Sequence, residues 1–66
     1  MIEEEFGTCA GIVWESLNIN GEMTAAKLLK ISGLDTKLLY AALGWLGREG
    51  KIEMKQKGKD TVFKLV

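Results

Sequence analysis

Closely spaced lysines are the residues of this sequence best placed to do chemistry. Lys51, Lys55, Lys57 and Lys59 fall within nine residues of one another. Ammonium groups at this density suit phosphate oxygens, and such contacts give salt-sensitive affinity that does not depend on base sequence. The alternative is structural, since lysines on an edge strand prevent aggregation between sheets. Both interpretations remain open at this stage.

A second group of polar side chains shares one face of a helix predicted over residues 36–49. At about 100° per residue, apolar side chains cover one broad side of this helix. The opposite side carries Thr36, Lys37, Tyr40, Ala41, Gly44, Gly47 and Arg48. Two of these side chains are cationic, which suits an anionic partner. The same composition is also typical of any solvated helix face.

The sequence lacks the residue combinations that enzymes and metal sites need. It contains no histidine and one cysteine, Cys9, and a lone thiol cannot build a structural zinc site. No paired catalytic carboxylates and no Gly-rich loop between a strand and a helix are recognisable. Cys9 lies on an apolar helix stripe, which favours a buried, inert thiol over a nucleophile. We therefore expect no enzyme activity, no metal and no cofactor.

Charge is distributed unevenly along a chain whose formal net charge is zero. Residues 1–22 carry five acidic residues and no basic one, whereas residues 23–66 carry nine basic and four acidic residues. This asymmetry indicates a basic working face or charge pairing between subunits, with ordinary solvated charge as the alternative. No apolar run reaches the roughly 18–20 residues of a membrane span, and the acidic start MIEEEF differs from a signal peptide. A cytoplasmic protein is the simplest interpretation.

Capping residues and apolar spacing predict three helices within a single domain, residues 1–66. The first helix is expected over residues 3–17, with acidic residues in its first turn. Its apolar stripe is Phe6, Cys9, Ala10, Val13 and Leu17. A second helix is expected from the N-cap Thr24 to Gly33, and Asp35 caps a third helix that Gly50 ends. Two capped helices joined by a short turn containing glycine are a helix-turn-helix signature.

Two runs of alternating residues near the end of the chain predict a β-hairpin. Residues 51–57 and 61–66 each place apolar side chains on one side, and a loop containing Gly58 joins them. A single hairpin is not stable alone, so its apolar side must lie on the helices. Ile19, between the first two helices, could add one short pairing strand. The predicted fold class is α+β, mainly α, with three helices followed by a C-terminal hairpin.

This order of elements resembles that of winged helix-turn-helix domains. The run MTAAKLLKISGLDTKLLYAALGWLGREGKI looks like that family, with a Thr-capped helix, a Gly-Leu turn, a recognition helix and a Gly-Lys-Ile entry into the wing. More narrowly, VWESL and ALGWLGREGKI resemble a family of small stand-alone winged helix proteins in bacteria and archaea whose role is unassigned. The resemblance covers nearly the whole chain. It implies that helix 36–49 is the recognition helix and that residues 51–66 form the wing.

By this resemblance, the polar face of helix 36–49 is the side that enters the major groove of double-stranded DNA. Lys37 would reach a guanine edge or a phosphate, and Tyr40 a phosphate or a thymine methyl group. Thr36, at the helix N-terminus, would contact a phosphate, and Arg48 the DNA backbone. The wing would add phosphate or minor-groove contacts from Lys55, Lys57 and Lys59.

The capped helix-turn-helix and the net basic half with its lysine wing predict a DNA-binding protein that regulates transcription, and we expect it to act as a homodimer. The alternative is a protein–protein interaction module on the same scaffold, because the chain is neutral overall and the exposed helix face has few cations. Small and apolar residues outside the main stripe of the first helix indicate a second contact surface. This predicted dimer interface consists of Gly7, Gly11, Ile12, Trp14 and Ile19.

The glycines inside helix 36–49 are a further unusual feature. Gly44 and Gly47 should each cost roughly 1 kcal/mol relative to alanine, because glycine loses the most backbone freedom on ordering. Both avoid the apolar side and join Ala41 in a shallow strip beside Tyr40. The strip, called the glycine strip below, would allow a DNA groove or another helix to approach closely, or would simply face solvent.

Overall fold

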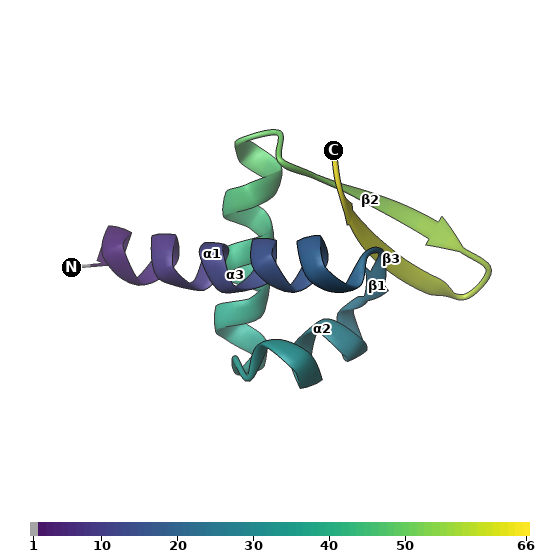
Figure 1. Cartoon of the computed structure of the whole chain (residues 1–66), viewed down its shortest axis with the longest axis horizontal. Coiled ribbons are helices and arrows are strands. Elements are labelled where there is room, and N and C mark those ends of the chain that lie inside the picture. Colours follow the sequence, from purple (N-terminus) through teal and green to yellow (C-terminus); the bar gives the residue numbers. More distant parts are fainter. Residues whose placement is uncertain (1) are drawn as a thin grey trace.

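Three helices and a small antiparallel sheet make up the computed structural model, which describes the backbone of residues 2–66 and the side chains of residues 7–66. The elements are α1 (Ile2–Asn20), β1 (Met23–Thr24), α2 (Ala25–Ser32), α3 (Thr36–Arg48), β2 (Ile52–Lys57) and β3 (Asp60–Leu65). α1 crosses α3 and packs on it, and the β2–β3 hairpin extends on the side away from the N-terminus (Figure 1). The predicted α+β architecture is confirmed. None of the described helices is both long enough and apolar enough to cross a membrane.

Side-chain caps set the start of α2 and of α3. The Thr24 hydroxyl accepts a hydrogen bond from the backbone N–H of Lys27, with 3.2 Å between the two atoms. The Asp35 carboxylate accepts the N–H of Leu38 at 2.8 Å. Each bond satisfies a donor that the first turn of a helix leaves unpaired. Gly33 follows α2 with a φ of +72°, so both predicted caps and the predicted helix stop are confirmed.

A Schellman motif ends α3 and directs the chain into β2. The Lys51 N–H donates to the Leu46 carbonyl at 3.0 Å, and the Gly50 N–H donates to the Gly47 carbonyl at 3.1 Å. Gly50 has a φ of +72°, the left-handed conformation that this motif needs and that glycine adopts without strain. Glu49 is the C-cap, so α3 stops one residue before its predicted end.

β3 lies at the centre of the sheet, whose strand order is β1–β3–β2. Phe63 of β3 pairs with Met23 of β1 on one side and with Met54 of β2 on the other, both in antiparallel register. The hairpin closes at the Lys57–Asp60 pair, which leaves two residues for the turn. β3 therefore ties the segment between α1 and α2 to the wing.

The prediction of a short strand near Ile19 is wrong in position. α1 continues through Ile19 to Asn20 and is longer than predicted, while the third strand forms at β1. The N–H of Gly21 still donates to the Leu17 carbonyl at 2.8 Å, and the φ of +80° at Gly21 then ends the helical path. Ile19 is part of this helix, and β1 and β2 occupy both edges of β3.

The hydrophobic core lies where the three helices meet the inner side of the sheet, defined here as the side that faces them. Leu28 of α2 and Leu39 of α3 are almost completely buried in it, and Phe63 enters it from β3. The stripe predicted for α1 is buried at Cys9, Ala10, Val13 and Leu17, and its first member, Phe6, lies outside the described side chains. Trp14 and Trp45 are half-buried and pack against this core.

Candidate nucleic-acid interface

The polar face predicted for α3 is exposed from the first turn to the last, except at Ala41, which is half-buried. Thr36 and Lys37 lie in its first turn, Tyr40 is 53% exposed one turn later, and Arg48 lies in the last turn. The other side of α3 is buried in the core, as the helix wheel predicts. At 1.5 Å per residue, Thr36 and Arg48 are about 18 Å apart along the helix axis. The structure therefore groups the first three side chains and leaves Arg48 at a separate point.

The N-terminus of α3 already holds a negative charge. The Asp35 carboxylate accepts the Leu38 N–H, which is one of the donors that a phosphate would otherwise use. Asp35 also interacts favourably with the positive end of the helix dipole. A phosphate near Thr36 would meet this carboxylate, so the helix terminus itself disfavours an anion, and the cation of Lys37 must supply the attraction there.

An apolar groove lies between α3 and the inner side of β2. Its lining residues are Tyr40, Leu43, Gly44, Gly47, Ile52, Met54 and Phe63, and its volume is about 380 Å³. None of these side chains is charged, and Met54 is 69% exposed. The sequence predicts Met54 on the apolar side of the hairpin but not its position beside α3, because that position depends on how the hairpin folds back. Met54 is a candidate contact residue that sequence reasoning missed.

Gly44 and Gly47 of the glycine strip line this apolar groove. A Cβ atom built on Gly44 or on Gly47 meets no heavy atom of the described residues within 4 Å, apart from its chain neighbours and the adjacent backbone of α3. Neither glycine has a positive φ, so the backbone there does not require glycine. No contact within the described residues explains these two glycines, and the space above them remains open to a ligand.

The wing lysines fall into two groups in the structure. Lys55 and Lys59 are exposed and form no ion pair with any described side chain, whereas Lys57 donates a hydrogen bond to the Glu22 carboxylate. Lys51 approaches Glu49 at 3.7 Å. The predicted cluster is therefore partly neutralised within the chain. Glu22 is a residue that sequence reasoning missed: the charge asymmetry was interpreted as a basic face or as pairing between subunits, whereas this pair forms within one chain.

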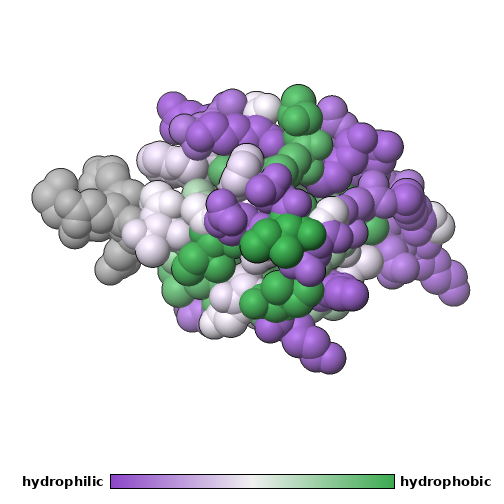
Figure 2. Space-filling model, in the orientation of Figure 1, coloured by the Kyte–Doolittle hydropathy of each residue, from purple (hydrophilic) through white to green (hydrophobic). Residues whose placement is uncertain are grey.

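The residues predicted for the dimer interface lie on two sides of α1. Gly7, Gly11 and Trp14 line a hollow together with Trp45 of α3. A second hollow runs between Gly11, Ile12 and Ile19 on α1 and Ile31 on α2. Its three isoleucines, called the isoleucine face below, are 38%, 75% and 41% exposed in chain order. Figure 2 shows exposed apolar side chains over α1 and α2 with hydrophilic ones between them.

The described residues contain no assembled metal site. No group of three or more His, Cys, Asp or Glu side chains among residues 7–66 could hold an ion. Cys9 is buried in the core at 7% exposure, which confirms the predicted burial of this thiol.

The arrangement described above defines a winged helix domain: a capped helix-turn-helix followed by a β-hairpin and completed by a short strand before α2. The chain belongs to the winged helix-turn-helix domain family DUF2582, whose model matches residues 1–65. Winged helix domains commonly act as DNA-binding modules rather than as enzymes. No curated protein matches the chain.

Two solved structures are similar to this fold. The solution NMR structure of protein BT2368 from Bacteroides thetaiotaomicron is 28% identical, with a TM-score of 0.88, and the match covers 98% of this chain and 79% of that one. The crystal structure of the Zalpha domain from Carassius auratus PKZ in complex with Z-DNA is 23% identical, with a TM-score of 0.81. That match covers 92% of this chain and 97% of the Zalpha domain, and at this identity it shows a shared fold.

Proposed function

We propose that this protein is a small cytoplasmic DNA-binding domain that regulates transcription, with α3 as its recognition helix and residues 51–66 as its wing. The observation that carries the proposal is the exposed face of α3, with Thr36, Lys37 and Tyr40 grouped at the start of the helix. The wing adds Lys55 and Lys59, which no acidic side chain of the described residues neutralises. The similarity to a fold that has been crystallised with Z-DNA supports a nucleic-acid partner for this arrangement.

Binding to DNA is expected to be weak and steeply dependent on salt. Most of the affinity should not depend on the base sequence. If the four cations Lys37, Arg48, Lys55 and Lys59 each neutralise one phosphate, log K should fall with log salt at a slope of about −3.6. Affinity for a random-sequence duplex would then drop roughly a hundredfold between about 50 mM and 200 mM salt. Fluorescence anisotropy measures both quantities. Absence of binding at about 50 mM salt with micromolar protein would contradict the proposal.

Charge-matched variants locate the contact. Lys37→Ala should weaken binding and reduce the salt slope by about 0.9, because one phosphate contact is lost. Lys51→Ala removes the same charge from a lysine that approaches Glu49 and lines the hollow beside Trp14, so it is the control. Equal losses in the two variants would show that the effect comes from overall charge. A duplex in the Z form, titrated in parallel, shows whether the surface distinguishes DNA shape.

A protein–protein interaction module remains the second candidate function, because the apolar groove carries no charge. In that case a protein partner that the parent chain pulls down from a nuclease-treated lysate should be lost with the Met54→Lys variant. The same partner should still be recovered with the Lys37→Ala variant. Recovery of partners only when nucleic acid is intact would count against this alternative.

We also propose that the protein is a homodimer joined through the isoleucine face of α1 and α2. A C2 dimer buries the same patch of both subunits, and a chain of 66 residues has little interior of its own to bury such residues. Ile19→Asp should convert the dimer to the 7.3 kDa monomer in light scattering, because it places a charge in the contact. Met54→Asp, at a similarly exposed position outside this face, is the control and should leave the mass unchanged. A monomeric parent protein at micromolar concentrations would disprove the dimer.

A further inference from the structure

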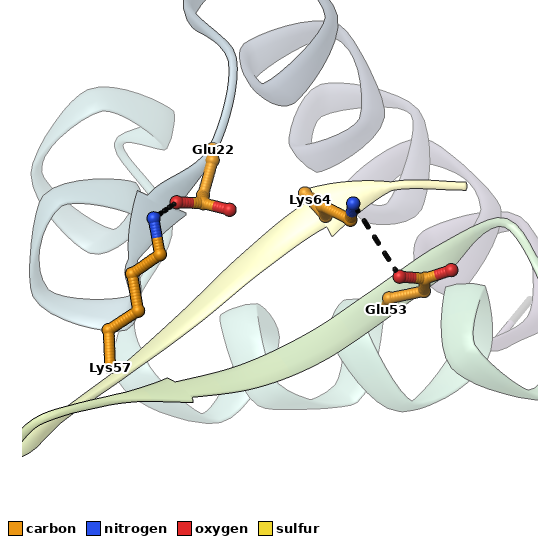
Figure 3. A network of polar contacts seen from close by, with 4 residues as sticks. All are labelled: Glu22, Glu53, Lys57 and Lys64. Carbon is orange, nitrogen blue, oxygen red and sulfur yellow. Dashed lines mark hydrogen bonds and ion pairs between the residues drawn. The ribbon is translucent and has the colours of Figure 1, made fainter.

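The outer face of the sheet, which points away from α3, carries a cluster of charged residues. Side chains alternate along a strand, and Phe63 and Met54 occupy the inner side. Lys64 of β3 and Lys55 of β2 therefore project from the outer face. Figure 3 shows this face with the helices behind it.

Glu22, the residue before β1, lies within this cluster of lysines. Lys57 of β2 donates a hydrogen bond to its carboxylate across the sheet, as Figure 3 shows. That hydrogen bond, together with the charges of Lys57, Lys55 and Lys64, holds the pKa of the Glu22 carboxyl below its usual value and outweighs desolvation. Lys64 also approaches Glu53 at 3.8 Å. On this face Lys57 thus pairs with Glu22 and Lys64 with Glu53, whereas Lys55 has no acidic partner among the described side chains.

The pairing of Glu22 with Lys57 shows that this face can hold an anion. A phosphodiester carries one negative charge and accepts N–H hydrogen bonds through its oxygens, as a carboxylate does. The cluster is open to solvent, since the Lys57 and Glu22 side chains are 60% and 29% exposed. Exposed ion pairs contribute little to stability, so another anion can replace Glu22 without disturbing the fold. Lys57 also directly precedes the hairpin turn, where a winged helix domain approaches a nucleic-acid backbone.

We propose that Lys55, Lys57 and Lys64 form a phosphate-binding site on the outer face, and that Glu22 occupies this site until a nucleic-acid backbone displaces it. Glu22 then acts as an internal competitor that weakens binding to all sequences alike. It also lowers the salt dependence, because salt weakens the Lys57–Glu22 pair that binding must break. The identity of the ligand rests on the proposed function, whereas the anion site itself does not.

The matched pair Glu22→Gln and Glu49→Gln tests this site in the full chain. Both changes remove one negative charge from an exposed Lys–Glu pair, but Glu49 faces Lys51, outside the cluster. Glu22→Gln should tighten binding to a random-sequence duplex roughly two- to fivefold, the range that corresponds to an exposed ion pair. It should also steepen the salt slope, and adding Lys57→Ala should reverse both effects. Identical behaviour of the two Gln variants would overturn the proposal.

A second probe separates failure of this site from failure of DNA binding. Inorganic pyrophosphate, titrated into labelled protein, should shift the backbone amide signals of residues 55–64 at lower concentration in Glu22→Gln than in the parent chain. If this occurs while no variant binds duplex, the proposed function is wrong and the anion site stands. If the parent binds duplex with steep salt dependence while Glu22→Gln changes nothing with either probe, the site is wrong and the proposed function stands.

Discussion

Leu39→Ala is expected to unfold a large part of the protein population under native conditions. Leu39 is 1% exposed in the core and lies on the side of α3 opposite the proposed DNA-binding face. Removing its side chain leaves a cavity and should cost about 2–5 kcal/mol. A chain of 66 residues has a total stability of only roughly 3–10 kcal/mol. The loss is therefore comparable to the whole stability of the domain.

Urea denaturation followed by circular dichroism measures this effect. Met54→Ala is the matched control, because Met54 is also a large apolar residue but is 69% exposed, and it should change the free energy of unfolding by less than about 0.5 kcal/mol. A loss below about 1 kcal/mol for Leu39→Ala would show that the core around α3 is not packed as described.

Replacing Gly44 and Gly47 together by alanine is expected to raise stability and to lower binding. An added Cβ meets no atom within 4 Å at either position, and neither glycine has a positive φ. Each substitution should therefore gain about 0.5–1 kcal/mol, since alanine loses less backbone entropy in a helix. The two methyl groups would also narrow the apolar groove beside Tyr40 and Met54. Any backbone or side chain that approaches the glycine strip closely would be pushed away.

The same denaturation and anisotropy experiments measure both properties. Gly50→Ala is the control for the stability effect: its φ of +72° strains any other residue, so it should destabilise the protein by about 1–2 kcal/mol. If the double alanine variant is stabilised and binds duplex as tightly as the parent chain, the glycine strip faces solvent and has no role in binding.

The elements of this fold could be predicted because their signals are local. Thr24 and Asp35 bond to N–H groups three residues away, and Gly33 and Gly50 adopt the φ values that end their helices. The third strand could not be placed in the same way. Its position depends on pairing with Phe63, far along the chain, and apolar character at Ile19 gave no information about that register.

Only the part of the candidate site that lies on a single helix could be predicted from the sequence. The exposed face of α3 follows from helical periodicity, so Lys37 and Tyr40 lie where the sequence places them. The Glu22–Lys57 contact joins residues 35 positions apart, and the apolar groove needs the hairpin to fold back beside α3. Neither contact produces a periodic pattern in the sequence, because each forms only when separate elements pack together.

The strand order β1–β3–β2 has a consequence for how the protein is made. β1 and β2 both pair with β3 and not with each other, so a nascent chain that has emerged only as far as residue 59 has no partner for either strand. The helices can form earlier on the ribosome, but Phe63 is needed to complete the core that they share. β3 thus joins both other strands and completes the core, so the native state requires β3 to dock on the helices.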